Sequence, residues 1–193
     1  MILNRPARIV LLASVLIAGI APKAQATNIV LNGSFETGSF ASWTPVGDQT
    51  FNGVQCPGPG PTVAQGNCSA FFGAVGTTGG ISQTLATSVG AVYFVNFAFL
   101  PDGGAPSSFS AQFGATTLLS LTNPPSSAAY QFFSFGVTAT SANTTLTFNF
   151  RDDPGFLFLD RVEVLTTPEP ATLSLLGLGL AAVARMRRRS TRK

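Results

Sequence analysis

The 193-residue sequence contains no histidine. Without an imidazole, the chain has no Ser-His-Asp or Cys-His catalytic arrangement and no zinc site with histidine ligands. Lysine is also absent between residues 27 and 165, which removes Ser-Lys dyads and Schiff-base chemistry from that segment. Paired carboxylates remain, as glycoside hydrolases use them. The only adjacent pair is Asp152-Asp153, and the sequence RDDPG around it predicts a hairpin turn.

Charge is scarce, at 10% of the residues, and it is unevenly placed. Residues 27–165 hold seven acids and two bases, a net charge of −5, and these are Glu36, Asp48, Asp102, Asp152, Asp153, Asp160, Glu163, Arg151 and Arg161. Nucleic-acid binding depends on neutralising phosphates, so this composition argues against a nucleic-acid partner. All other cations lie towards the two ends of the chain.

The first 26 residues have the pattern of a secretory signal peptide. Arg5 and Arg8 form its charged start, residues 9–21 are apolar, and Ala24-Gln25-Ala26 is a small-x-small cleavage site. We therefore expect a signal helix that is cleaved before Thr27. An uncleaved N-terminal anchor is the alternative.

The C-terminal segment combines an apolar run with a basic end. Residues 171–184 would form a helix of about 21 Å, which is short for a hydrocarbon core of about 30 Å. Six cations follow the run: Arg185, Arg187, Arg188, Arg189, Arg192 and Lys193. The positive-inside rule places them in the cytoplasm, so the segment predicts a single transmembrane helix with the preceding domain outside.

Pro168-Glu169-Pro170 stands immediately before that apolar run. With the run and the arginine cluster, it resembles the PEP-CTERM sorting signal of Gram-negative bacteria, here residues 166–193. The resemblance implies processing by an exosortase in the inner membrane after a transient anchoring. It also implies release to the cell surface or the extracellular matrix, often alongside exopolysaccharide. A plain C-terminal anchor is the alternative.

The sequence has two cysteines, Cys56 and Cys68, which enclose a loop rich in proline and glycine. In an exported chain they predict one disulfide. A reactive thiol or a metal-binding pair is the alternative.

Between residues 27 and 165 the pattern is that of short antiparallel strands separated by Gly, Pro and Asn. Residues 91–100 place Tyr93, Val95, Phe97 and Phe99 on one face, and residues 144–150 alternate in the same way. Further strands are expected at 69–75, 80–86, 107–114, 116–121, 130–138 and 156–165. No helical stripe interrupts them, so the fold class is all-β, an antiparallel β-sandwich or jelly roll.

The two ends of this domain resemble the galactose-binding-like jelly rolls, which include many carbohydrate-binding modules. The matching residues are NIVLNGSFE at 28–36, which we expect to be the opening strand, the downstream Trp43, and Asp160 in the last strand. The resemblance implies a structural Ca²⁺ held by Glu36, Asp160 and backbone carbonyls near Asn32.

The parity of the last strand independently predicts a buried Asp160. Phe156, Phe158, Val162 and Val164 would share its face. A buried carboxylate needs a partner. The alternative to calcium is that Asp160 accepts backbone N–H bonds or pairs with Arg151, with Glu36 exposed.

We interpret the chain as an exported, non-catalytic surface or matrix protein that binds polysaccharide. Two alternatives stay open: a glycan-active enzyme that uses carboxylates alone, and a purely structural matrix protein. No carbohydrate-binding residue can be assigned from the sequence. Trp43, Tyr93 and Tyr130 are candidates by residue type, but Trp43 and Tyr93 are expected to be buried, which leaves Tyr130.

Overall fold

The computed structural model describes residues 25–57, 63–167, 177 and 179–180. The predicted signal helix and the Pro-Glu-Pro element with its basic end lie outside these residues. Of the predicted C-terminal helix, Gly177, Gly179 and Leu180 are described, and they are helical. Among the residues described, no helix has the length and apolar character needed to cross a membrane.

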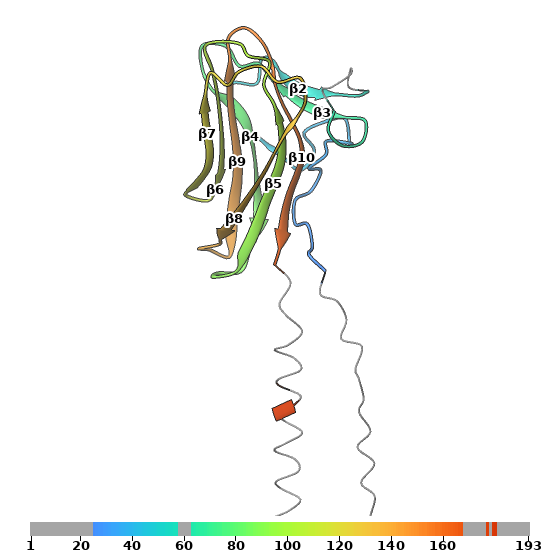
Figure 1. Cartoon of the computed structure of the whole chain (residues 1–193), viewed down its shortest axis with the longest axis vertical. Helices are drawn as coiled ribbons and strands as arrows, with labels where there is room; N and C mark the ends of the chain where they lie inside the picture. Colours follow the sequence, from blue (N-terminus) through green and yellow to red (C-terminus); the bar gives the residue numbers. More distant parts are fainter. Residues whose placement is uncertain (1–24, 58–62, 168–176, 178, 181–193) are drawn as a thin grey trace, which may run out of the picture. The chain divides into compact units, whose positions relative to one another are not determined.

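Within the described residues, ten strands form two five-stranded antiparallel sheets that pack face to face (Figure 1). The first sheet has the order β1 (Thr44–Gly47), β4 (Gly79–Ala86), β9 (Asn143–Asp152), β6 (Ser107–Phe113) and β7 (Thr116–Thr122). The second has the order β2 (Asn52–Gln55), β3 (Ser69–Phe72), β10 (Leu157–Thr166), β5 (Val92–Leu100) and β8 (Gln131–Thr138). The predicted all-β sandwich is therefore confirmed.

Phenylalanine rings fill the space between the sheets. Phe72 of one sheet stacks on Phe150 of the other, with ring centroids 3.8 Å apart, and Phe99 stacks on Phe109 at 4.2 Å. All four side chains are fully buried or nearly so. Offset and stacked aromatic pairs add to the free energy gained by burial, so these contacts hold the two sheets in register.

The predicted opening strand at 28–36 is wrong. The segment makes a single bridge, Asn28 to Leu165, and then turns, with Asn32 and Phe35 at positive φ. Gly33 is required here, because a Cβ at that position would clash with the carbonyl of Val162. Two short strands that alternation did not predict, β1 and β2, follow this segment instead.

The expected parity of the last strand is also wrong, because a β-bulge lies between Asp160 and Glu163, with Arg161 at a φ of 50°. The extra residue reverses which side chains face the core. Phe158 therefore faces away from the core with Asp160, while Val162 faces into it. Asp160 is buried as expected, but beneath a loop on the outer face of the sheet.

Candidate functional site

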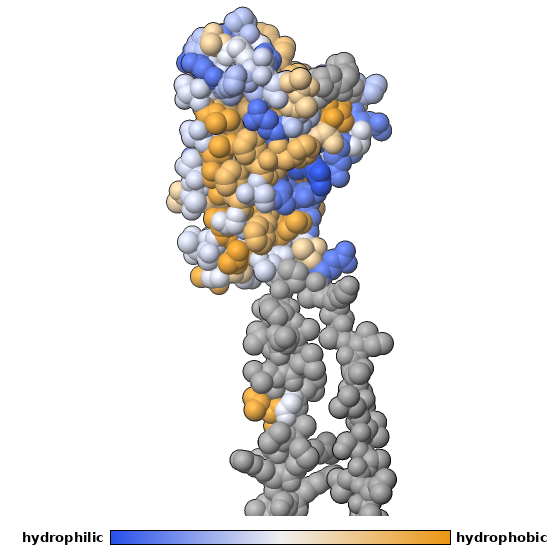
Figure 2. Space-filling view, in the orientation of Figure 1, coloured by the Kyte–Doolittle hydropathy of each residue, from blue (hydrophilic) through white to orange (hydrophobic). Residues whose placement is uncertain are grey.

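The outer face of β10, β5 and β8 carries a shallow hollow of about 270 Å³. It is lined by Asn96, Phe97, Phe132, Phe133, Ser134, Arg161 and Glu163. In Figure 2 this face shows a broad apolar area with polar side chains at its margin. An apolar hollow with a few convergent polar groups is the usual form of a ligand site.

Three polar residues form a row across the three strands of this face. Asn96 is the register partner of Glu163 on one side and of Ser134 on the other. Neighbouring strands lie about 4.8 Å apart, so the carboxylate, amide and hydroxyl are spaced along a line perpendicular to the strands. Such a row can donate and accept hydrogen bonds towards a ligand that lies on the sheet.

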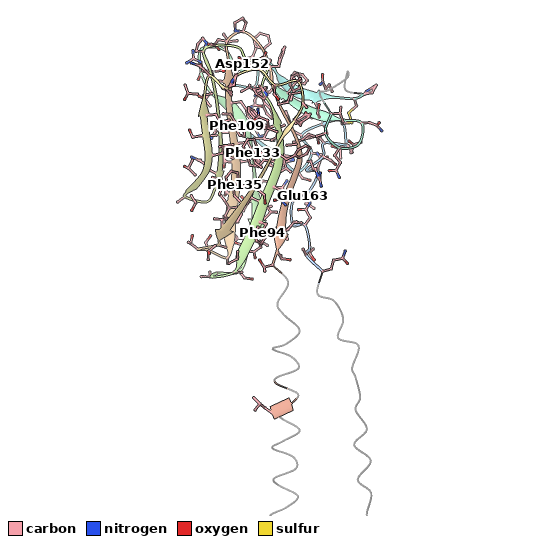
Figure 3. All side chains as sticks on the ribbon, viewed as in Figure 1. Phe94, Phe109, Phe133, Phe135, Asp152 and Glu163 are labelled. Carbon is pink, nitrogen blue, oxygen red and sulfur yellow. A yellow bond between two sulfur atoms is a disulfide. The ribbon has the colours of Figure 1, made fainter. Side chains whose placement is uncertain are left out.

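Aromatic rings flank this polar row on its two sides, along the direction of the strands. Phe132 is 63% exposed and Phe94 is 44% exposed, and both are on the same outward face. Gly136 stands opposite Phe94 on β8, which leaves the Phe94 ring uncovered by a side chain at that position. Phe94 and Glu163 are labelled in Figure 3. Two exposed rings on one face of a sheet provide apolar surface that a ligand can cover.

The bulge brings Arg161 into this face. Its guanidinium lies 5.8 Å from the centre of the Phe132 ring, and its Nε is 3.9 Å from a carboxylate oxygen of Glu163. A guanidinium over an aromatic face is attracted by the ring quadrupole. The same residue thus positions one of the two exposed rings and offers further N–H donors beside the polar row.

The three aromatic residues considered from the sequence are not the exposed ones. Trp43 and Tyr93 are buried as expected, and their polar atoms bond to the backbone at Asn32 and Ser88. Tyr130 is half-buried, and burial raises the pKa of its hydroxyl. The site residues Phe94 and Asn96 did carry a signal, since they alternate with the core residues of β5, but which strands adjoin them could not be inferred.

Asp160 lies at the edge of this face, under the loop between β2 and β3. One carboxylate oxygen accepts the N–H groups of Ala64 and Gln65 at 2.7 and 2.8 Å, and the other accepts that of Arg161 at 2.6 Å. These contacts match the alternative in which backbone N–H groups satisfy the carboxylate. Arg151 takes no part, because it pairs with Asp153.

Glu36 holds the other end of the same loop. One of its oxygens accepts the N–H groups of Asn67 and Cys68, both at 3.0 Å, and its side chain is exposed. The disulfide between Cys56 and Cys68 closes the loop, as predicted from the sequence. The loop is therefore anchored by a covalent bond and by two carboxylates.

The predicted calcium ligands Glu36 and Asp160 do come together at this loop. Burial is the main cause of the raised pKa of Asp160, and the negative charge of Glu36 adds to it. A cation between them would relieve that repulsion, but their oxygens already accept backbone N–H groups, so calcium binding here stays a prediction. The carbonyl of Asn32, in contrast, already accepts the indole N–H of Trp43 at 3.0 Å.

A second hollow, of about 290 Å³, lies on the other sheet. Its lining is more polar and consists of Thr78, Ser108, Phe109, Ser110, Ser120, Leu121, Thr122 and Asn149. It offers hydroxyl and amide groups, but its one aromatic ring, Phe109, is buried in the core. It therefore lacks the exposed rings of the face on β10, β5 and β8.

Solved structures of carbohydrate-binding modules share this architecture. TmCBM61, in complex with β-1,4-galactotriose, is similar with a TM-score of 0.59 and 18% identity, over 74% of this chain and 99% of that one. The CBM22-1 xylan-binding domain of Paenibacillus barcinonensis Xyn10C is similar with a TM-score of 0.50 and 14% identity, over 75% and 97%. The fold is thus a jelly roll of the carbohydrate-binding-module type.

The same fold also occurs in enzymes. The Stig cyclase Fisc from Fischerella sp. TAU is similar with a TM-score of 0.55 and 16% identity, over 75% of this chain and 99% of that one. At such identities the likeness defines the fold, and the function must be argued from the site.

The C-terminal segment matches a known family of sorting signals. Residues 166–189 match the PEP-CTERM protein-sorting motif, which confirms the resemblance drawn from Pro168-Glu169-Pro170 and the residues after it. This motif marks an exported protein with a C-terminal sorting signal that an exosortase processes. No curated protein sequence matches this chain.

Proposed function

We propose that the mature protein is a non-catalytic, polysaccharide-binding component of the cell surface or extracellular matrix. The observation that carries this proposal is the outer face of β10, β5 and β8, where the row Glu163, Asn96 and Ser134 lies between the exposed rings of Phe94 and Phe132. Sugars offer apolar C–H faces to aromatic rings and hydroxyls to amides and carboxylates. The open hollow suits an extended chain better than a single ring.

Two comparisons support the class of ligand. The similar modules bind β-1,4-galactotriose in one case and xylan in the other, so both bind chains of sugars. The sorting motif supports export of this protein across the inner membrane, where it could meet extracellular polysaccharide. The sorting signal also supports a transient anchoring with the C-terminus in the cytoplasm and then release.

The described residues favour binding over hydrolysis. Glycoside hydrolysis needs two accessible carboxylates about 5 to 10 Å apart, on either side of the bond that breaks. Glu163 is the one carboxylate that lines the hollow on this face. Asp152, which belongs to the only adjacent acidic pair, is fully buried at another place in the fold.

Affinity electrophoresis tests the binding proposal directly. The full chain, purified in a non-ionic detergent, is run in gels that contain β-1,4-galactan, xylan or the exopolysaccharide of the native host. We expect retardation by at least one of them, and its loss in Phe132→Ala and Asn96→Ala, because stacking and hydrogen bonding each contribute about 1 kcal/mol or more. Release of reducing ends from the same polymers would contradict the non-catalytic role.

Ser120→Ala is the matched control, since Ser120 is exposed in the hollow of the opposite sheet. It should migrate as the parent chain does. Loss of retardation in this variant, with Phe132→Ala unchanged, would move the site to the other face. No retardation by any polymer would overturn the proposal and favour a purely structural matrix protein.

The sorting proposal has its own test. The intact mass of the protein from the matrix or medium of its native host should lack the residues after the Pro168–Pro170 element. An uncut chain in the inner-membrane fraction would instead show that the segment acts as a plain anchor.

A further inference from the structure

Asp152, the last residue of β9, is a buried carboxylate that the fold leaves unpaired. Its exposed fraction is 0%. Within the part of the chain that the structure describes, neither of its carboxylate oxygens has a hydrogen-bond partner. A buried charge is tolerated when it is paired or coordinates a metal, so this carboxylate calls for a neutralising group.

A second carboxylate faces it from the loop between β5 and β6. Asp102 is held there by two backbone contacts, since its oxygens accept the N–H groups of Gly104 and Phe156, each at 2.8 Å. Burial is the main cause that raises the pKa of Asp152 to about 7, and contact with Asp102 adds to it. Two carboxylates that meet have no donor between them, so their contact is repulsive when both are ionised.

A backbone carbonyl joins the two carboxylates. A Cβ added to Gly104 would clash with an oxygen of Asp152 and would lie 3.2 Å from both Asp102 Oδ1 and the Pro154 oxygen. A Cβ at Gly155 would clash with the other oxygen of Asp102 and lie 3.1 Å from Asp152 Oδ2. Three oxygen-bearing groups therefore converge where two glycines leave room.

The nearby side-chain cation is already engaged. Arg151 donates two hydrogen bonds to Asp153, at 3.1 and 2.6 Å. Asp153 in turn accepts the N–H of Gly76 at 2.9 Å, and its pKa is lowered by Arg151. Residues 27–165 contain no lysine or histidine, and the other arginine lies over Phe132.

We propose that Asp102, Asp152 and the carbonyl of Pro154 bind a hard divalent cation, with calcium as the favoured ion. Carboxylate and carbonyl oxygens are the ligands of Ca²⁺, which accepts irregular geometry and completes its shell with water, whereas Mg²⁺ demands a near-ideal octahedron. A proton shared by the two carboxylates is the competing arrangement. A shared proton would neutralise only one of the two carboxylates, and it would not give the Pro154 carbonyl a group to bind.

The cation fastens two separate loops at one end of the sandwich. Asp102 belongs to the β5–β6 loop, whereas Asp152 and Pro154 belong to the β9–β10 hairpin. Figure 3 places Asp152 at the end of the sandwich opposite Phe94. With two carboxylates, the site is of the weak class found in extracellular modules, with a Kd of about 10⁻⁴ to 10⁻³ M. It would therefore fill after export, where calcium is plentiful.

Isothermal titration with CaCl₂ at pH 7.5 tests the site on the chelator-treated full chain in non-ionic detergent. The parent chain and all its variants carry Glu36→Gln, which removes a ligand of the other calcium site, predicted at Glu36 and Asp160. We expect this parent to bind one Ca²⁺ and Asp102→Asn to bind it on the order of tenfold more weakly. Asp153→Asn, which alters the neighbouring residue, should bind as the parent does.

Asp152→Asn is the second variant, because a fully buried position is more sensitive than the exposed Asp102. Its unfolding midpoint without calcium shows that it folds, and we expect calcium to shift that midpoint less than in the parent. Calcium uptake that is equal in the parent, Asp102→Asn and Asp152→Asn would overturn the proposal. So would a parent that takes up no calcium, which would indicate a shared proton.

Discussion

Replacing Asp152 by Asn in calcium-free buffer should stabilise the protein, although the side chain is fully buried. The pKa of Asp152 is raised from 3.8 to about 7, chiefly by burial and then by Asp102. The folded state therefore binds more protons than the unfolded state between about pH 4 and pH 7, so stability falls as the pH rises through that window. A shift of about three pKa units corresponds to about 4 kcal/mol of unfolding free energy lost by pH 8.

Asparagine at this position has no charge to lose, and its amide can donate hydrogen bonds to Asp102 and to the Pro154 carbonyl. Urea unfolding of the full chain in EDTA, at half-unit steps from pH 4 to pH 8, measures the difference between Asp152→Asn and the wild type. That difference should grow with pH and reach a few kcal/mol in favour of the variant at pH 8.

The neighbouring substitution Asp153→Asn is the control. The pKa of Asp153 is lowered by its hydrogen bond to Arg151, so its charge stabilises the folded state above the ordinary pKa. This variant should gain nothing at pH 8. A difference between Asp152→Asn and the wild type that does not change with pH, or a less stable variant at pH 8, would refute the reasoning.

The remaining predictions concern the fold and the β2–β3 loop. Replacing Cys56 and Cys68 by serine should reduce the unfolding free energy by about 3 kcal/mol in urea, because the closed loop spans 12 residues; an unchanged value would show that the disulfide is dispensable. Phe150→Ala should cost about 3 to 5 kcal/mol, since its ring stacks across the sheets, and a smaller loss would mean that the core collapses around the gap. Gly33→Ala should destabilise the fold more than any exposed substitution, and a normal midpoint would refute the close approach to the Val162 carbonyl. If calcium binds at Asp160, adding calcium back after EDTA treatment should raise the unfolding midpoint of Asp152→Asn. It should not raise the midpoint of the double variant Asp152→Asn, Asp160→Asn.

Strand β5 shows how much the alternation of residues within one strand predicts. Alternation predicted that Tyr93, Val95, Phe97 and Phe99 face the core, and all four are buried. The same alternation leaves Phe94 and Asn96 outside, but it does not say that a carboxylate from β10 and a hydroxyl from β8 stand beside Asn96. Register partners come from distant parts of the chain, so the site follows from strand order and not from any local pattern.

The last strand shows where alternation fails. The bulge at Arg161 reverses the parity of β10, and hydrophobic spacing alone contained no sign of it. Asp160 was expected to be buried and is, but two of its three N–H partners belong to a loop nearly one hundred residues earlier in the chain. The extra residue of a bulge leaves the ladder locally unpaired, so its position depends on the contacts around the strand and not on alternation within it.

By itself, the sequence determined the C-terminal sorting signal, the disulfide, the all-β class and the core face of most strands. Each of these features follows from composition or from a pattern that extends over a few neighbouring residues. Only the tertiary structure decided that Asp102 meets Asp152, that Glu163, Asn96 and Ser134 form a row, and that phenylalanines are the exposed rings beside it. These juxtapositions arise from the pairing of strands that are far apart in the chain, and their energies exist only once the two sheets have packed.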